Sequence, residues 1–527
     1  MKLARLLKEY KYVVIFVCGY VLLRILLINI NITEWGDSFR ILRAAKALLH
    51  FSYPLDEKRL PVFSALLAPG LLFWEPVLWG RIYAILAAVV NLVLATILFK
   101  LIYPKAKQAH LLTVILLLAL NPIFFYWSLL IMAETTFTIF VLLAFVVYLA
   151  DREHWRYSCY VLGVIIALAS LTRYEGFLLA GAFGLGYLAK KDWRRLIKVF
   201  SAWLVVVAPW FVLTKLVLSG GTSDAYVSEL QTFNFGFYRL GYFLTYSLFF
   251  IGSPILLGLL ILDVYPRIIK FKAKTNFLGL VTNPIVIFVF LEFALFFVWT
   301  PSLPRIMLPI IPLAVIMVVK TLVGLDLKDA AVLRRLLLVS AASTICYLLL
   351  QFKFKLYFLV LSYFGLGLIL ILSFLALLGM WLGSRKLLVG SVALTLALGS
   401  FVVVANQRLV YSTVYAASLA TRDLEGNIAY SDETGVTSWY LGSRGVSLPQ
   451  NIELTLDEQQ AWLWKNDVKY ILDTNEFNRG SKLAVTSLTC GPRFEETIAD
   501  YLDSLLIKCG LMVRRDYPIL YSQLCKV

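Results

Sequence analysis

Long apolar runs recur along most of this 527-residue chain. Many are roughly 17 to 25 residues long, the length that an α-helix needs to cross about 30 Å of hydrocarbon. With 61% hydrophobic residues and a mean hydropathy of +0.82, the chain is far more apolar than a soluble domain. The sequence therefore predicts an α-helical membrane protein that crosses the bilayer many times.

The number and length of these runs predict about thirteen transmembrane helices. We expect them near residues 12–30, 80–101, 109–128, 134–150, 157–172, 176–190, 197–218, 240–262, 281–300, 305–323, 334–351, 355–382 and 387–405. The first run is longer than the core of a signal peptide, and no small-x-small cleavage site follows it, so we expect a retained helix. An odd number of spans and a cytoplasmic amino terminus place the carboxyl-terminal region outside.

The formal charge of +17 comes mainly from short clusters of Lys and Arg between the apolar runs. Three of them are Lys2/Arg5/Lys8/Lys11, Lys190/Lys191/Arg194/Arg195/Lys198 and Arg267/Lys270/Lys272/Lys274. Clusters of this kind on alternate loops are typical of the cytoplasmic side of membrane proteins. No nucleic-acid partner is expected, because the basic residues do not follow one polar face. We predict a multi-pass protein of the cell membrane, surrounded by membrane lipids.

The first outer loop, residues 31–79, is the most elaborate polar interval in the chain. In the segment 38–50, apolar residues recur at helical spacing on one side and basic residues lie on the other. This pattern predicts a helix on the membrane surface, with an apolar side made of Ile41, Leu42, Ala45, Leu48 and Leu49. The stretch Pro61–Trp74 is short for a span and begins with proline, so we expect a second, partly immersed helix.

From about residue 406 the composition becomes that of a soluble domain. We therefore divide the chain into a membrane domain, residues 1–405, and an extracytoplasmic domain, residues 406–527. The periodicity of the second part predicts strands at 427–431 and 468–472, a helix through 455–464 behind a capping box, and a helix at 494–508. These elements predict a small α/β domain.

Cysteine usage leaves one question open in this second domain. Cys490, Cys509 and Cys525 all lie in it, and three is an odd number. In an extracytoplasmic domain two of them could form a disulfide and leave one thiol over. The sequence does not decide between a disulfide and free thiols.

Ionisable residues also lie at the outer ends of predicted helices, where a charge is costly unless it is solvated or paired. They are Asp37, Glu134, Glu175 and Arg305, and residues that share one membrane face can line one cavity. Simpler roles stay open for the acidic ones. Asp37 is placed to be an N-cap, Glu134 to interact with a helix dipole, and Glu175 to pair with Arg173.

Two arginines of the outer face need an explanation of their own. Arg305 precedes a predicted helix, where its charge opposes the helix dipole, so it must reach the interface by snorkelling or bind an anion. Arg59 follows the surface helix of the first loop and is placed to contact a headgroup. For both residues the sequence leaves a structural and an anion-binding role open.

Several short strings, in this order and on this side of the membrane, resemble motifs of the GT-C glycosyltransferases that use lipid-linked sugars. The resemblance is strongest to the protein O-mannosyltransferases and the lipid A aminoarabinose transferase. The strings are Glu34-Trp35-Gly36-Asp37, Arg59-Leu60-Pro61-Val62-Phe63, Ala133-Glu134-Thr135, Thr172-Arg173-Tyr174-Glu175-Gly176 and Arg305-Ile306-Met307-Leu308-Pro309. Departures from the motifs include Leu60 and Tyr174, which stand where the relatives have proline.

This resemblance implies a GT-C fold and an inverting glycosyltransferase. The donor would be a sugar on polyprenyl phosphate, and the acceptor a hydroxyl on a lipid, a glycan or a protein. By similarity, Asp37 would be the general base, and Glu134 would orient the acceptor or sugar hydroxyls. The resemblance also implies that Arg305 and Arg59 bind the leaving phosphate, with Arg173 and Glu175 as further substrate-binding residues.

A metal requirement stays open at this point. Asp37, Glu134 and Glu175 offer oxygen ligands of the kind that Mg²⁺ and Mn²⁺ prefer, while some relatives work without a metal. We therefore expect no certain cofactor and assign no metal ligand.

Two other classes of protein remain to be weighed. A lipid or solute transporter would place charges near the middle of its helices and show a repeat between its halves. In this chain the charges lie mainly at outer helix ends, Glu292 is the one clear acidic residue inside a run, and the halves do not match. A membrane anchor for a binding domain would not need so many helices. The glycosyltransferase is the favoured interpretation.

Overall fold

The computed structural model describes residues 10–54, 57–150, 157–216, 253, 255–256, 258–260, 282–298, 304–324, 329–354, 363–421, 423–430, 435–447, 456–474, 489–490, 494–495 and 521–526. The chain divides into two compact units. Unit 1 consists of Met1–Ile28 and Ala44–Val403, and unit 2 of Asn29–Arg43 and Val404–Val527. A piece of the first outer loop therefore groups with the carboxyl-terminal part of the chain.

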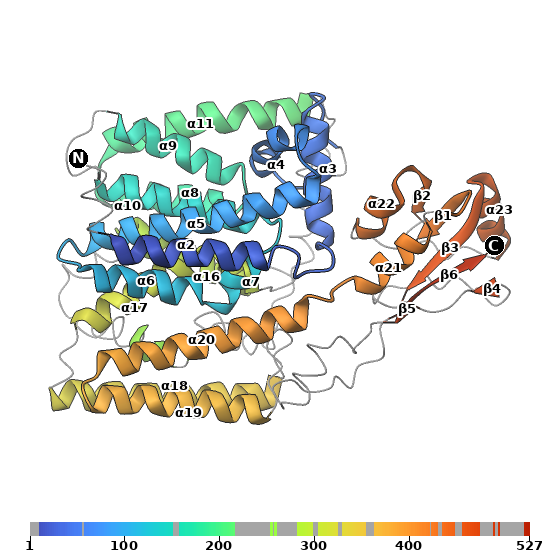
Figure 1. The fold of residues 1–527 in the computed structure, drawn as a ribbon. Coiled ribbons are helices and arrows are strands. Elements are labelled where there is room, and N and C mark those ends of the chain that lie inside the picture. The colour runs from blue at the N-terminus through green and yellow to red at the C-terminus, as the bar shows by residue number, and fades with distance from the viewer. Residues whose placement is uncertain are drawn as a thin grey trace. The chain divides into compact units, whose positions relative to one another are not determined.

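Unit 1 is a bundle of α-helices with short 3₁₀ helices, and α5, α8, α9 and α11 run side by side in it (Figure 1). Its helices are α2 Lys11–Leu26, α4 Pro61–Leu67, η1 Ala68–Leu72, α5 Pro76–Ile102, α6 Gln108–Ala119, α7 Pro122–Trp127, α8 Ala133–Ala150, α9 Ser158–Ser170, α10 Gly176–Ala189, α11 Trp193–Leu216, α16 Pro284–Val298, η4 Pro304–Met307, α17 Ile311–Gly324, α18 Ala330–Phe354, α19 Tyr363–Trp381 and α20 Arg385–Gln407. The last of these crosses the boundary into unit 2.

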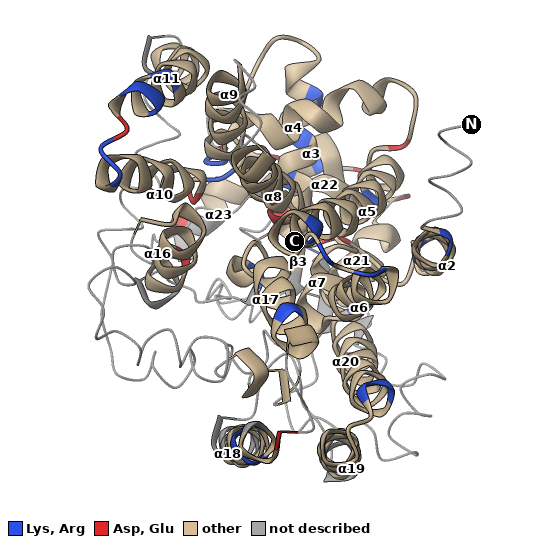
Figure 2. Ribbon diagram, turned by 90° about the vertical axis from the view of Figure 1, so that its left-hand side faces the viewer, with Lys and Arg blue, Asp and Glu red and all other residues tan. Residues whose placement is uncertain are grey.

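The apolar character of these helices confirms a polytopic α-helical membrane protein. Within the described part of the chain, four helices are long and apolar enough to cross a membrane: Pro76–Ile102, Ala133–Ala150, Trp193–Thr214 and Arg385–Ala405. Shorter apolar helices, among them α9, α10 and α17, accompany them. Figure 2 shows that Lys, Arg, Asp and Glu are sparse along the helices of this unit. The number of spans stays a prediction, and the expected span 240–262 lies largely outside the described residues.

Two expected spans are interrupted, and proline explains both interruptions. The span expected at 109–128 is split into α6 and α7, because Pro122 has no backbone N–H to donate and the Asn121 side chain caps the new helix through Ile123 N and Phe124 N. The span expected at 305–323 begins as η4 and continues as α17 only from Ile311. Proline at 309 and 312 restricts the backbone between these two helices.

Close helix contacts and a few buried polar bonds hold the helices of this bundle together. The Asn91 side chain in α5 donates to the backbone oxygen of Ala87 at 3.0 Å and to that of Thr135 in α8 at 2.9 Å. Helices α9 and α11 approach so closely that a Cβ on Gly163 would lie 2.3 Å from the backbone oxygen of Val199. The bond from Asn91 to Thr135 thereby fixes the start of α8, which carries Glu134, to α5.

One arginine is fully buried inside this bundle. Arg24 of α2 has no exposed surface. Its Nη1 donates to the backbone oxygen of Phe125 at 2.8 Å, and its Nη2 donates to the Tyr20 hydroxyl at 2.6 Å and to the Ser128 hydroxyl. Its Cζ lies 4.4 Å from the centre of the Phe125 ring. Neutral oxygens and an aromatic face thus surround this charge and tie α2 to α7.

Unit 2 contains a small mixed sheet, and its α/β character confirms the class predicted for the tail. The sheet has the order β2-β1-β3-β6-β4, with β5 paired to β6; β1 runs parallel to β2 and β3, and β6 runs antiparallel to β3. The elements are α21 Ser412–Ala420, β1 Asn427–Tyr430, α22 Val436–Leu441, η5 Gly442–Arg444, β2 Gly445–Ser447, α23 Leu456–Lys465, β3 Val468–Thr474, β4 Thr489–Cys490, β5 Phe494–Glu495 and β6 Tyr521–Lys526.

Most of the elements predicted for the carboxyl-terminal region that lie in the described residues are present in unit 2. Strands β1 and β3 and helix α23 lie where the sequence predicted them. The helix expected at 494–508 is wrong at its start, because Phe494 and Glu495 form strand β5 and pair with Tyr521 and Ser522 of β6. Pairing with a distant strand outweighs local helix preference there. The rest of that segment lies outside the described residues, and so does the threonine expected to open the capping box.

The first-loop segment of unit 2 packs on the carboxyl-terminal part through aromatic contacts. The Phe39 ring lies 5.2 Å from the ring of Trp439 and 5.4 Å from that of Tyr440, and the Thr33 hydroxyl is 2.7 Å from the Tyr440 hydroxyl. Helix α3, Gly36–Leu48, begins in this segment and ends in unit 1. Protein buries the apolar side that we expected to face lipid, since Ile41, Leu42 and Ala45 are at most 2% exposed.

Candidate active site

Helix ends and one turn of unit 1 bring together four of the predicted site residues. Glu134 lies in the first turn of α8, Arg173 and Glu175 lie in the turn between α9 and α10, and Arg305 lies in η4. These elements are far apart in sequence. Of the four ionisable residues expected to share one place, Glu134, Glu175 and Arg305 come together, with Arg173 between them, whereas Asp37 belongs to unit 2. We call Glu134, Arg173, Glu175 and Arg305 the arginine–glutamate cluster.

Glu134 is the centre of this cluster. Its side chain is 2% exposed, and its Oε1 lies 2.6 Å from Arg173 Nη1 and 3.3 Å from Arg305 Nε. These approaches are ion pairs by distance and do not have the in-line geometry of hydrogen bonds. A carboxylate buried to this extent needs positive partners, and the structure supplies two. Glu134 therefore fixes where both guanidinium groups lie.

The turn between α9 and α10 holds the second ion pair. Arg173 Nε donates to Glu175 Oε1 at 3.1 Å, and Arg173 Nη2 pairs with the same oxygen. Arg173 is 20% exposed and Glu175 13% exposed, so both side chains reach the surface. Glu175 thus has the pairing with its neighbour that its sequence position indicated. The result is a chain of alternating charges from Glu175 through Arg173 and Glu134 to Arg305.

Arg305 is held on its other side by α7 and the segment that follows it. Its Nη1 lies 3.6 Å from Met132 Sδ, and its Cζ lies 5.7 Å from the centre of the Trp127 ring. The side chain is 18% exposed. A carboxylate, a soft sulfur and an aromatic face thus hold this guanidinium in position. Its exposed edge is suited to bind an anion.

Glu292 in α16 is a residue that our site prediction missed. It is completely buried, and neither of its carboxylate oxygens has a hydrogen-bond partner among the described residues. It lies within electrostatic range of Glu175 and Arg173. The one sequence signal for Glu292 was its position inside an apolar run. Its neighbours Arg173 and Glu175 come from the turn between α9 and α10, far away in the sequence.

Arg59 is held by its own loop. Glu57 Oε1 accepts from Arg59 Nη1 at 2.8 Å and from the Arg59 backbone N–H at 2.9 Å, and the Tyr53 hydroxyl donates to the Arg59 backbone oxygen at 2.7 Å. Burial and the negative charge of Glu57 raise the pKa of Tyr53. The Val62 N–H donates to the Leu171 oxygen at 3.0 Å, which ties this loop to the turn of Arg173.

The remaining predicted site residue, Asp37, belongs to unit 2. Helix α3 begins at Gly36, so Asp37 lies inside the first turn rather than at the N-cap that we considered. A carboxylate there is favoured by the helix dipole. Its side chain is partly buried. Asp37 therefore belongs to unit 2, and the arginine–glutamate cluster belongs to unit 1.

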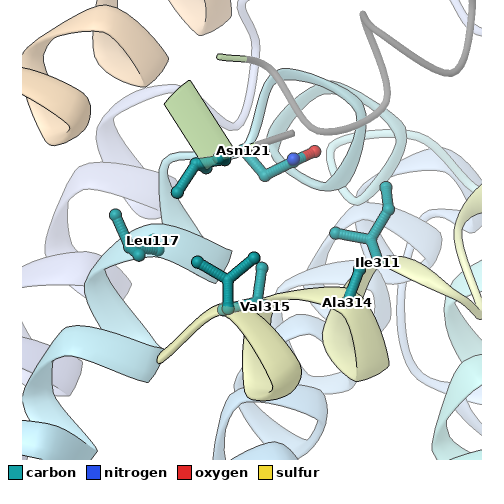
Figure 3. A pocket seen from close by; sticks show the side chains of 7 residues that line it. Leu117, Asn121, Ile311, Ala314 and Val315 are labelled. Carbon is teal, nitrogen blue, oxygen red and sulfur yellow. The ribbon is translucent and has the colours of Figure 1, made fainter. Parts of the chain in front are cut away.

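A small pocket lies between α6, the cap of α7, and α17. Figure 3 shows Leu117, Ile311, Ala314 and Val315 around it, with the Asn121 amide as the polar group among the labelled residues. Its cavity volume is about 10 Å³, which is the size of a single water molecule. A cavity of this size cannot take a sugar, so the pocket is a packing feature.

The carboxylates do not form a metal centre in the described residues. No group of three or more His, Cys, Asp or Glu side chains comes together there. Glu134 and Glu175 lie at ion-pair distance from guanidinium groups, and a requirement for Mg²⁺ or Mn²⁺ stays an open prediction.

Comparison with known proteins supports the fold and the resemblance. Residues 61–218 match the family described as dolichyl-phosphate-mannose-protein mannosyltransferase. Comparison with curated proteins found no match. The crystal structure of ArnT from Cupriavidus metallidurans bound to undecaprenyl phosphate is similar with a TM-score of 0.62 at 15% identity, over 98% of both chains. Its apo state gives 0.61 at 15% identity, over 97% of this chain and 98% of that one.

These matches confirm the resemblance that the sequence motifs indicated. The likeness to ArnT spans nearly the whole of both chains, so this chain shares the fold of that structure. The family match covers α4 through α11 and includes Glu134, Arg173 and Glu175. The comparisons do not test the role of any single residue.

Proposed function

We propose that this protein is an inverting glycosyltransferase that moves a sugar from a polyprenyl-phosphate donor to an acceptor hydroxyl at the outer face of the membrane. The observation that carries the proposal is the pair of partly exposed arginines, Arg173 and Arg305, held by the buried Glu134 within a GT-C fold. The family match and the fold favour a transferase over the transporter alternative.

The donor phosphate explains why the cluster is built from arginine. When the bond between the anomeric carbon and the phosphate oxygen breaks, its electron pair stays on the phosphate, whose negative charge increases. Guanidinium groups that are already in place stabilise this charge without reorganising. We assign this role to Arg305 and Arg59, with Arg173 as a further binding residue. The bound undecaprenyl phosphate of the ArnT structure supports a ligand of this class.

The carboxylates have different roles in this proposal. Glu134 faces two guanidinium groups at ion-pair distance, so we assign it the task of placing Arg173 and Arg305. The family resemblance had implied a direct role with the acceptor or sugar hydroxyls. Glu175 continues the same chain of charges through Arg173. Asp37 is proposed as the general base on the strength of its motif.

The reaction can then be written with its proton and electron pair. Asp37 takes the proton of the acceptor hydroxyl as that oxygen attacks the anomeric carbon from the face opposite the phosphate. The new carbon–oxygen bond forms while the bond to phosphate breaks, so the configuration at the anomeric carbon inverts. A positioned general base typically contributes about 10²–10⁴ in rate.

The orientation in the membrane is also a proposal. The positive-inside pattern of the loops supports an active site and a carboxyl-terminal domain on the extracytoplasmic side. The donor would then lie with its phosphate at the outer surface and its tail among the helices. A lipid, a glycan or a protein hydroxyl would be the acceptor.

Product stereochemistry tests the proposal. The purified full-length protein would be given polyprenyl-phosphate sugars with a panel of lipid, glycan and peptide acceptors, and the product configuration would be read by NMR. We expect release of polyprenyl phosphate and a glycoside of inverted configuration. A product of retained configuration, or no transfer from any of these donors, would reject an inverting transferase.

A further inference from the structure

The loop that carries Arg59 is organised around a buried carboxylate that has no assigned role. Glu57 is 1% exposed, although it lies in a polar loop next to charged residues. One oxygen, Oε1, accepts from both the backbone N–H and Nη1 of Arg59. The other oxygen, Oε2, is buried and has no hydrogen-bond partner among the residues described here. A buried carboxylate is costly unless it is paired, and within the described part of the loop Arg59 supplies the pairing.

Tyr53 reinforces the same arrangement from the other side. Its hydroxyl donates to the Arg59 backbone oxygen, and its ring packs edge-on against Trp210 with 5.1 Å between ring centres. The Arg59 backbone is thus held at its N–H by Glu57 and at its carbonyl by Tyr53. The loop is further joined to the turn of Arg173 through Val62 and Leu171. Arg59 is therefore not an arginine that moves freely along the membrane surface.

We propose that Glu57 is a positioning residue that fixes the Arg59 guanidinium for the donor phosphate. This inference rests on the proposed function, because it takes Arg59 as a phosphate ligand. Glu57 does not touch the substrate. It holds Nη1 of a side chain that is 15% exposed, so the guanidinium is presented to the ligand in one orientation.

Two physical effects oppose each other when the charge of Glu57 is removed. Without its negative charge, Arg59 would attract a phosphate more strongly. Without its carboxylate, the guanidinium and the loop backbone would lose their fixed geometry, and phosphate binding would have to order them. Partial exposure of Arg59 screens the first effect, whereas the second acts through two hydrogen bonds. We therefore expect the loss of fixed geometry to dominate. Weaker phosphate binding by the variant indicates this positioning effect, and tighter binding indicates the charge effect.

The experiment measures how tightly the full-length protein in detergent binds polyprenyl phosphate and, as a neutral reference, polyprenyl alcohol. The amide oxygen in Glu57→Gln can still accept from Arg59 but carries no charge. We therefore expect about tenfold weaker binding of the phosphate, because charge-assisted hydrogen bonds become weaker neutral ones, with alcohol binding unchanged. Glu57→Asp should recover part of the affinity. The matched control is Glu75→Gln, a carboxylate that only caps α5 through Val77 N and Leu78 N; phosphate affinity should not change.

The outcomes separate this inference from the function on which it rests. If Arg59→Ala loses phosphate affinity while Glu57→Gln binds as tightly as wild type or more tightly, the positioning role is rejected and the proposed function stands. If Arg59→Ala binds normally, the role is likewise rejected. If wild type does not prefer phosphate over alcohol, the proposed function itself fails. Should Glu57→Gln not fold, Tyr53→Phe, which loses only the hydroxyl, should weaken phosphate binding about threefold; unchanged binding would reject the role.

Discussion

Arg24 and Arg305 lie in the same helical unit and both rest on α7, yet their surroundings differ in kind. Arg24 is completely buried among a carbonyl, two hydroxyls and aromatic rings, and no carboxylate pairs with it in the described part of the chain. Arg305 is 18% exposed and pairs with Glu134. The comparison teaches that burial and partner type separate an arginine that fixes the fold from the arginine to which we assign phosphate binding.

The same short helix serves both arginines in this comparison. Phe125 contacts Arg24 through its oxygen and its ring, and the Trp127 ring faces Arg305. Asn121 and Pro122 start α7 and set its direction. Arg24 thus helps to hold the helix on which Arg305 rests. Substitutions at the two positions should therefore act on different measurements.

The largest expected effect is on activity, at Arg305. Arg305→Ala removes a guanidinium that we assign to the leaving phosphate, and loss of such a fixed donor lowers turnover by about 10²–10³-fold. Its thermal stability should fall less than that of Arg24→Met, because Arg173 still pairs with the buried Glu134. Turnover of the purified protein measures the loss of activity, and thermal unfolding measures the change in stability. Arg195→Ala is the control, since Arg195 is an exposed arginine paired with Asp192; equal activities of both variants would remove Arg305 from the site.

The next effect is on stability, at Arg24. Arg24→Met leaves the Phe125 oxygen and the Tyr20 and Ser128 hydroxyls without their donor, which costs about 3 kcal/mol in the free energy of unfolding. Turnover per folded molecule should stay near that of wild type. Denaturant unfolding monitored in detergent gives the first quantity, with Arg335→Met on an exposed helix position as the control. An Arg24→Met protein that is as stable as wild type but inactive would contradict the assignment of Arg24 to the fold.

Glu134→Gln sharpens the comparison, because it changes what Arg305 pairs with. The neutral amide keeps the size of the side chain but no longer holds two guanidinium groups. We expect turnover to fall about tenfold, equivalent to about 1.4 kcal/mol of transition-state stabilisation. Glu175 pairs with Arg173 and not with Arg305 in the described structure. The turnover of Glu175→Gln should therefore fall less than that of Glu134→Gln. Kinetics of both variants at saturating donor test the order, and a larger loss at Glu175 would contradict it.

The smallest effect concerns the aromatic face beneath Arg305. Trp127→Leu removes the cation–π contact, which is worth about 0.5–1 kcal/mol at a partly exposed site. This corresponds to a rise of about two- to fivefold in the KM for the donor. Trp127→Phe keeps an aromatic face and should lie close to wild type. If Trp127→Leu and Trp127→Phe have the same KM for the donor, the ring only fills space and the cation–π contact contributes nothing.

Some of this arrangement could be predicted from sequence, for local reasons. Arg173 and Glu175 are two residues apart, so their pairing followed from spacing, and the positions of Glu134 and Arg305 followed from the ends of apolar runs. The split between α6 and α7 carries a local signal too, since an Asn-Pro pair is a turn signal that the apolar count of 109–128 overrode.

The rest depends on contacts between distant parts of the chain. Nothing local indicates that Glu134 lies between Arg173 and Arg305, or that Arg24, inside an apolar run, meets Phe125 and Ser128. The strand at Phe494 forms because β6 is beside it. Likewise, Asn29–Arg43 groups with the carboxyl-terminal unit through contacts such as Thr33 with Tyr440.

Donor binding tests the central claim most directly. Wild type, Asp37→Asn and Arg305→Ala would be purified in detergent, and their thermal stabilisation by a panel of polyprenyl-phosphate sugars measured. We predict that one donor stabilises wild type and Asp37→Asn alike but not Arg305→Ala, because the phosphate is held by arginine and the base acts only in the reaction. Stabilisation by a free solute, with none by any polyprenyl-phosphate compound, would contradict the account and favour a transporter.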